Sequence, residues 1–152
     1  MYLPVRNIVN NLQKFHSELA KFYSSLAERT ENGKVRSLLK YLEKSERYQE
    51  GYICYYIKHT PAHILNQSIN YMPRTTNNLI FDCKIGSGIE MPATVSDVMK
   101  IALTYDVCLI NFCDTLAKEG DNPVAKELFC KFCKVTKREE GNLFTYSSLM
   151  AS

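Results

Sequence analysis

Two residues that could do chemistry stand inside an apolar stripe between Leu38 and Ile53. If this segment, LLKYLEKSERYQEGYI, is a helix, one of its faces carries three apolar residues and two polar ones. The residues of that face are Leu39, Leu42, Glu46, Gln49 and Ile53. A buried carboxylate is costly unless a hydrogen bond, an ion pair or a metal ion satisfies it. Glu46 and Gln49 therefore indicate a buried polar site, in which a transition metal could be bound.

Four long amphipathic helices are predicted to position these side chains. Apolar residues recur at steps of three and four over residues 8–26 and again over 98–116. The chain is long enough for one domain, 1–152, that buries about two-thirds of its surface. The predicted helices cover residues of about 5–29, 33–58, 95–119 and 123–147.

The predicted helix starts carry residues that are typical of caps. Asn32 and the Asn122-Pro123 pair are suited to begin the second and fourth helices. Thr94-Val-Ser-Asp97 has the pattern of a capping box at the start of the third helix.

Residues 60–93 break the helical pattern, because prolines and glycines are scattered among short apolar pieces. We expect a long crossover there, with room for one short helix. A connection of this length can travel back along a bundle of about 40 Å, which would leave the second and third helices parallel.

The two halves of the chain align with each other at a shift of 90 positions, as Leu19 with Leu109 and Asn32 with Asn122 illustrate. This internal repeat predicts two helical hairpins of common design. Counting along each hairpin from its turn puts polar residues of both halves at one level, about 22 Å from either end of the bundle. The predicted layer consists of His16, Glu46, Gln49, Asp106, Thr136 and Glu139.

Four segments of the chain resemble the ferritin-like, rubrerythrin-like four-helix bundles, and the resemblance extends over nearly the whole chain. The segments are HSELAKFYSSLAE, LLKYLEKSERYQ, DVCLINFCDTLAK and LFCKFCKVTKRE. The resemblance implies an all-α fold, a ferritin-like four-helix bundle of two duplicated helical hairpins joined by a long crossover. It also implies a di-iron site, made by a Glu from the first and third helices and a Glu-x-x-His from the second and fourth.

Carried over to this chain, those positions are His16, Glu46 with Gln49, Asp106, and Thr136 with Glu139. Only Glu46 has the residue type of the family, and Thr136 stands where a bridging carboxylate is needed. The resemblance therefore implies a degenerate di-iron site.

Two interpretations of the layer remain open. In one, a single iron, zinc or manganese ion is held by His16, Glu46, Asp106 and Glu139, which offer a mixed set of nitrogen and oxygen donors. In the other, no metal is bound and the side chains satisfy one another, with one carboxylate protonated. The excess negative charge of three acids around one histidine requires either a cation or raised carboxylate pKa values.

Two further groups of side chains have both a functional and a structural interpretation. Cys130 and Cys133 could form a redox or zinc pair, but their position in the middle of a helix favours simple packing. Most of the six cysteines are expected to be reduced. The tyrosines of the second helix could form a ligand or dimer surface, or could be covered by the crossover. They are Tyr48, Tyr52, Tyr55 and Tyr56.

The net charge of +3 is spread over alternating basic and acidic residues, which gives no indication of nucleic acid or an anionic membrane surface. The chain lacks a signal-peptide pattern and any apolar run of about 18 residues, so we expect a soluble, cytoplasmic protein. No catalytic motif is present in the sequence.

The sequence predicts a non-catalytic or single-metal-binding protein that acts through protein association, with a homodimer as one option. The alternative is an iron-dependent oxidoreductase or metal-storage protein with an altered ligand set.

Overall fold

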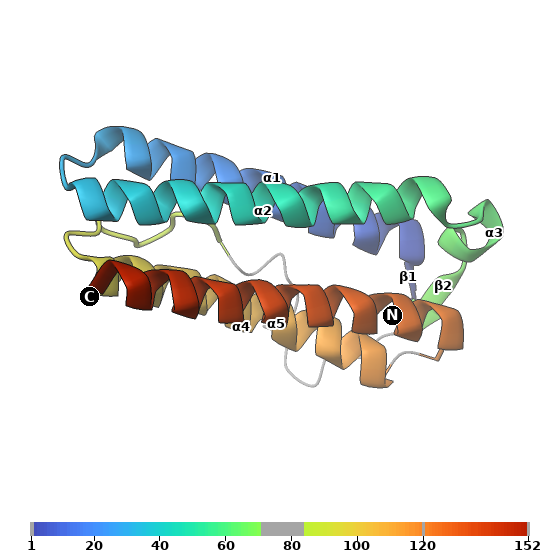
Figure 1. Ribbon diagram of the computed structural model, residues 1–152. Helices are drawn as coiled ribbons and strands as arrows, with labels where there is room; N and C mark the ends of the chain where they lie inside the picture. Colours follow the sequence, from blue (N-terminus) through green and yellow to red (C-terminus); the bar gives the residue numbers. More distant parts are fainter. Residues whose placement is uncertain (1, 71–83, 120, 152) are drawn as a thin grey trace.

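The computed structural model describes residues 2–70, 84–119 and 121–151 (Figure 1). Four long helices dominate it, and the predicted all-α class is confirmed. They are α1 (Val5–Arg29), α2 (Gly33–His59), α4 (Val95–Glu119) and α5 (Pro123–Ala151). Helix α5 extends past the predicted end near residue 147.

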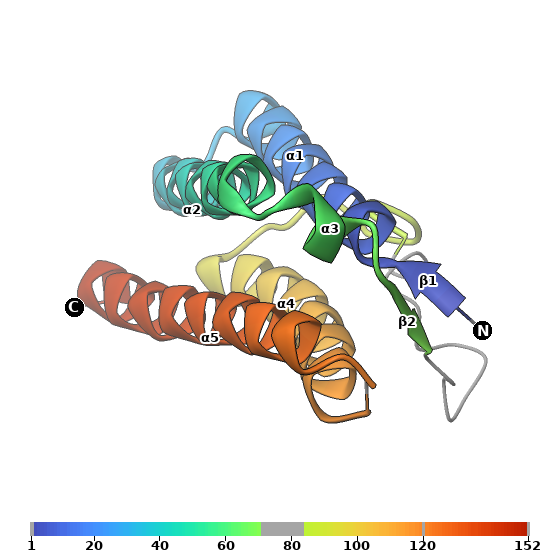
Figure 2. The same ribbon diagram turned by 90° about the vertical axis from the view of Figure 1, so that its right-hand side faces the viewer.

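The four helices form two antiparallel hairpins, α1 with α2 and α4 with α5, which lie against each other (Figures 1 and 2). The turns of the two hairpins are at opposite ends of the bundle (Figure 1). Helices α2 and α4 run in the same direction along the bundle (Figure 1). Helix α2 contacts both α4 and α5, so residues of α2 face the second hairpin.

The crossover begins with a short helix, α3 (Ala62–Leu65), and a strand, β2 (Ser68–Asn70), which pairs antiparallel with β1 (Tyr2–Pro4). The sequence prediction missed both strands, since three residues are too few to establish an alternating pattern. Leu3 lies opposite Ile69, which is 1% exposed, so the small sheet fastens the start of the chain to the crossover. The part of the predicted crossover at 71–83 lies outside the described residues.

Side chains at the helix starts explain where the helices begin. Asn32 Oδ1 accepts hydrogen bonds from the backbone of Lys34 and Val35, and Asn122 Oδ1 caps α5 in the same way. At the start of α4, the Asp97 backbone donates to Thr94 Oγ1 and the Asp97 carboxylate accepts from the Thr94 backbone, both at 3.1 Å. This reciprocal pair is the predicted capping box.

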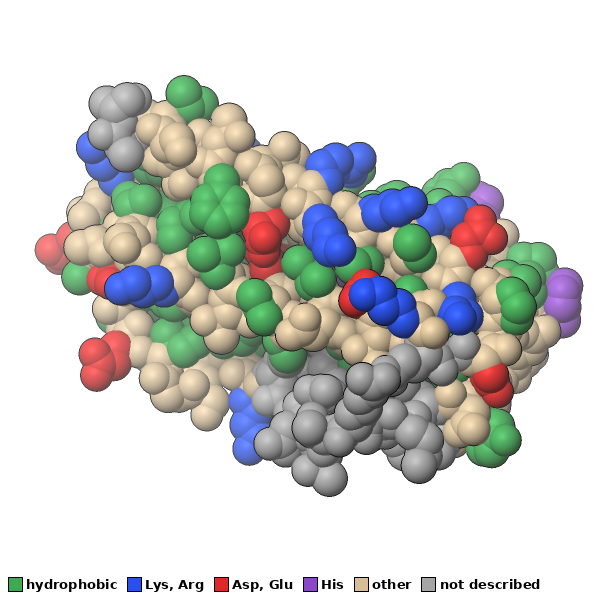
Figure 3. All heavy atoms as spheres, turned by 90° about the horizontal axis from the view of Figure 1, so that it is seen from below, with side chains coloured by type: hydrophobic (Ala, Val, Ile, Leu, Met, Phe, Trp, Pro, Cys, Tyr) green, Lys and Arg blue, Asp and Glu red, His purple; other side chains and the backbone are tan. Residues whose placement is uncertain are grey.

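The interior between the hairpins is mostly apolar. Leu12, Leu19, Leu38, Phe112 and Phe129 come from all four helices, and each is at most 2% exposed. A few polar side chains interrupt this core near the middle of the bundle. On the α4–α5 side of the molecule, apolar side chains are spread among charged and other polar ones (Figure 3). None of the described helices combines the length and the apolarity of a membrane-spanning segment.

Candidate functional site

The predicted polar residues come from all four long helices and lie mostly inside the bundle. His16 of α1, Glu46 and Gln49 of α2, and Thr136 of α5 are 2–4% exposed. Asp106 of α4 is 9% exposed. Glu139 of α5, which is half-buried, lies closest to solvent. We refer to these six side chains as the polar layer.

The strongest contact of the polar layer joins the two helices of the first hairpin. His16 Nδ1 and Glu46 Oε2 are 2.5 Å apart, and both side chains are almost fully buried. A short hydrogen bond between a carboxylate and an imidazole in a dry environment is strong, because neither group can turn to water instead. The pair therefore uses one nitrogen and one oxygen that a metal ion would otherwise need.

A second set of hydrogen bonds joins α2 to α5. The Thr136 hydroxyl donates to Gln49 Oε1 at 3.0 Å. Ser45 Oγ donates to Glu139 Oε2 at 3.0 Å and accepts a longer bond from Gln49 Nε2 at 3.4 Å. Sequence reasoning missed Ser45, because it lies beside the apolar face of α2 and not on it.

The side-chain carboxyl of Asp106 makes no hydrogen bond within the described residues. Burial raises the pKa of its carboxyl to about 8, and the negative charges of Glu46, Glu140 and Glu139 add to the shift. Asp106 is therefore mostly protonated at neutral pH. A neutral Asp106 relieves part of the negative charge that the sequence led us to expect inside the bundle.

Tyr23 of α1 belongs to the same buried region, although its place among the apolar residues of α1 is typical of a core residue. It is 1% exposed, and burial raises the pKa of its hydroxyl, with Glu46, Asp106 and Tyr105 contributing. Its position on the apolar stripe of α1 concealed this electrostatic contact with the carboxylates. Tyr105 is anchored differently, since its hydroxyl accepts a hydrogen bond from the backbone of Gly86 at 2.8 Å.

The donor set does not fit a di-iron centre. Such a centre needs carboxylates that bridge two ions, and here Gln49 and Thr136 occupy two ligand positions and bind each other. Glu46 is engaged by His16. Within the described residues, no three His, Cys, Asp or Glu side chains are grouped so that they could hold a metal ion. The binding of a single metal at the polar layer stays a prediction.

The cysteines contribute to packing. Cys54, Cys113, Cys130 and Cys133 are free thiols, whereas Cys108 takes part in a disulfide. Burial raises the pKa of both Cys113 and Cys133, which keeps their thiols protonated and weakly reactive. Because Cys108 is already bonded, it cannot contribute a thiolate to a zinc site with Cys130 and Cys133.

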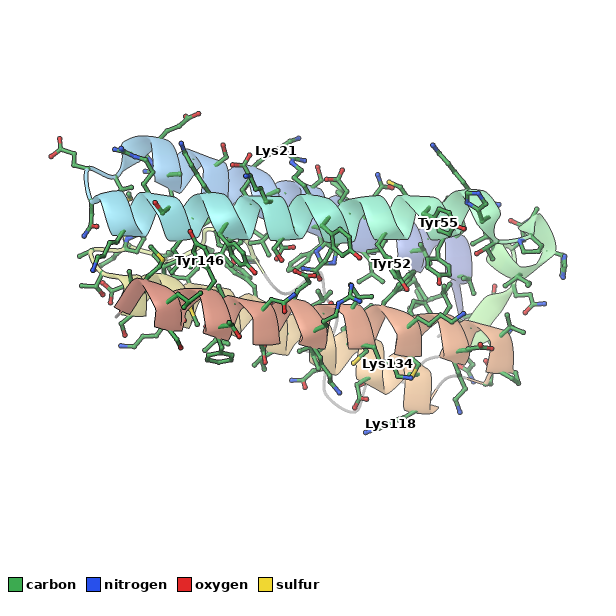
Figure 4. All side chains as sticks on the ribbon, in the orientation of Figure 1. Lys21, Tyr52, Tyr55, Lys118, Lys134 and Tyr146 are labelled. Carbon is green, nitrogen blue, oxygen red and sulfur yellow. The ribbon has the colours of Figure 1, made fainter. Side chains whose placement is uncertain are left out.

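The tyrosines of α2 pack against α5. The rings of Tyr52 and Tyr56 meet Phe132 edge to face, with centroids 6.2 and 5.8 Å away, and Arg138 donates to the hydroxyl of Tyr48. Tyr52 reaches from α2 toward α5 (Figure 4). These contacts come from α5, and cover of the tyrosines by the crossover stays a prediction, because residues 71–83 lie outside the described residues. Tyr48 and Tyr55 remain 50% and 56% exposed.

The fold is ferritin-like. It consists of two hairpins of long helices with α2 and α4 parallel, and it has a polar layer at mid-height. The solved structures include a neighbour with this fold, a proposed ferritin-like diiron-carboxylate protein from Thermotoga maritima. It is 16% identical, with a TM-score of 0.62 over 97% of this chain and 96% of that chain. At this identity the likeness establishes the fold, and it assigns no role to any residue. No protein-family model and no curated protein matches the sequence.

Proposed function

We propose that this protein is a non-catalytic member of the ferritin-like fold whose polar layer stabilises the bundle and which acts through association with other proteins. The observation that carries the proposal is the direct contact of His16 with Glu46 at 2.5 Å. A side-chain pair this close leaves no room for an ion between its two atoms. The layer then contributes to the fold what metal ligation contributes in a di-iron bundle, namely a link between the helices.

The hydrogen bonds between α2 and α5 support the same proposal. The bonds of Thr136 with Gln49 and of Ser45 with Glu139 join the two hairpins without a metal ion. Asp106 needs no cation to compensate its charge, because its raised pKa keeps it mostly neutral. A neutral Asp106 leaves Glu46 and Glu139 as the acidic groups of the layer, and each of them is hydrogen-bonded by a side chain of the protein itself.

The alternative function is that of a single-metal protein, either an iron-dependent oxidoreductase or a metal-storage protein. One observation favours it: Asp106, although buried, forms no hydrogen bond within the described chain, so its carboxyl is available to a ligand. In that case His16, Glu46 and Glu139 would have to exchange their present hydrogen bonds for an ion of iron, zinc or manganese.

Association is supported by large apolar side chains that are exposed at one end of α2 and the start of α5. Tyr55 and Val124 are 56% and 46% exposed and line the same open pocket, where the ring of His59 stacks on Tyr55 at 4.0 Å. Tyrosine is enriched at protein interfaces. The apolar groups on the face shown in Figure 3 are dispersed, so we favour the Tyr55 end over that face as the site of association, with a second copy as the simplest partner.

Metal analysis of the purified protein tests the proposal. The protein is prepared without chelator and without nickel affinity resin, and its iron, zinc and manganese contents are measured. We expect far less than one metal ion per chain. A stoichiometric metal that is lost in Glu46→Leu but kept in Glu31→Leu, a change at an exposed carboxylate, would contradict the proposal. Sedimentation of the same samples, with Tyr55→Ser for comparison, tests self-association.

A further inference from the structure

A small cavity adjoins the polar layer and is lined by residues of all four long helices. Its volume is about 10 Å³. Three polar side chains, His16, Gln49 and Thr136, form part of its wall, and the remainder includes Ile53, Leu109 and Phe132. The three polar residues are 2–4% exposed, so they depend on the interior of the protein for their hydrogen bonds.

The polar wall has hydrogen-bonding capacity that its own contacts do not use. His16 Nδ1 is engaged by Glu46, and His16 Nε2 makes no hydrogen bond within the described chain. The Thr136 hydroxyl donates its hydrogen bond to Gln49 Oε1. Both oxygens then still have a lone pair that can accept a further hydrogen bond. A buried nitrogen without a partner is energetically costly, so such atoms are nearly always paired with protein or water.

We propose that this cavity binds one ordered water molecule, which bridges His16 Nε2 to the hydroxyl oxygen of Thr136, with Gln49 Oε1 as a further acceptor. The size of the cavity supports this assignment, because a single water needs about 10–15 Å³ and two to four polar partners. The polar partners are present on one side of the cavity, and the volume excludes any larger ligand. The water either accepts from Nε2–H or donates to the Nε2 lone pair, and in both cases it has a proton left for an oxygen of Thr136 or Gln49.

The inference rests in part on the proposed metal-free layer, and a crystal structure at a resolution that shows ordered water separates the two. We expect one water peak within hydrogen-bonding distance of His16 Nε2 and of Thr136 or Gln49, without anomalous scattering. A dry cavity in a metal-free protein would overturn the water site and leave the proposed function intact. A metal with anomalous signal bound to His16 would overturn both.

A matched pair of variants tests the role of the hydroxyl. In Thr136→Val the cavity keeps its shape but loses one polar partner, and we expect the water peak to be lost or strongly weakened. In Thr104→Val, the lost hydroxyl is exposed and bonds only to the Lys100 carbonyl of its own helix, so the water should remain. Full retention of the water in Thr136→Val would contradict the proposed role of Thr136. The wild-type structure tests the site even if this variant does not fold.

Discussion

His16 and Glu46 lie 30 positions apart in the chain, on opposite arms of the first hairpin, and are joined in its interior by a 2.5 Å hydrogen bond between Nδ1 and Oε2. The turn of the hairpin is far from this contact, so the pair fixes how α1 and α2 pack against each other at mid-bundle. A buried pair of this kind has a consequence for mutation. Removing one partner leaves the other buried without compensation, whereas removing both leaves an apolar gap that can be filled.

The single variants His16→Leu and Glu46→Leu should therefore each lose about 3–5 kcal/mol of the free energy of unfolding. The double variant should be clearly more stable than the sum of the two losses predicts, because neither polar group is then left alone. Denaturant unfolding of the four proteins gives the coupling energy. Glu31→Leu, at an exposed site, serves as the control and should change little. Additive losses would show that the two side chains do not act as a pair.

Asp106 predicts a pH dependence of stability with a definite sign. Its pKa is raised from the ordinary value of 3.8 to about 8 in the folded protein. Between these two pH values the folded state therefore binds more protons than the unfolded state. The contribution of Asp106 is therefore complete below about pH 4 and is lost as the pH rises toward 8, at up to about 1.4 kcal/mol per pH unit. Asp106→Asn should flatten this decline and stabilise the protein at pH 8. Unfolding measured at several pH values, with Asp114→Asn on the same helix as a control, checks the prediction; an unchanged slope in Asp106→Asn would contradict it.

Ser45 should contribute to the packing of the second hairpin on the first through its bond to Glu139. Ser45→Ala gains helix propensity but loses this hydrogen bond. Ser37→Ala, at an exposed site of the same helix, gains the same propensity without the loss. We expect Ser45→Ala to be less stable than Ser37→Ala by about 1 kcal/mol in thermal or denaturant unfolding. Equal stabilities would mean that the Ser45 bond contributes nothing.

Tyr41 and Tyr146 form a further link between α2 and α5, since their rings are stacked with centroids 4.2 Å apart and planes at 8°. Tyr146 extends from α5 toward α2 (Figure 4). Tyr146→Leu keeps an apolar side chain and should cost about 0.5–1.5 kcal/mol through loss of the ring pair. Phe144→Leu, at an aromatic residue that is 47% exposed, is the matched control and should be nearly neutral. A loss of the same size in both variants would argue against a specific role of the stack.

The sequence could predict the helices because each apolar stripe extends over several turns, and the caps at Asn32 and Thr94 mark their starts. It could also predict that Glu46 and Gln49 are inside, because they interrupt such a stripe. It could not predict which hydrogen bonds those residues make. Ser45 bonds to Glu139 of the layer from a position beside the stripe. Tyr23 lies near the carboxylates of the layer, although its position in the sequence is that of a core residue. These contacts depend on how side chains from helices that are distant in the chain point toward one another. Periodicity alone does not determine those directions.

The most direct test of a polar layer that is complete without metal is the thermal stability of the protein in excess chelator and in added zinc, manganese or ferrous iron. A ligand that binds the folded state alone raises the unfolding temperature, by an amount that grows with the logarithm of its concentration relative to its Kd. We predict the same unfolding temperature in all of these conditions. An increase with one of the metals that disappears in Glu46→Leu, measured relative to the stability of that variant in chelator, would contradict the account.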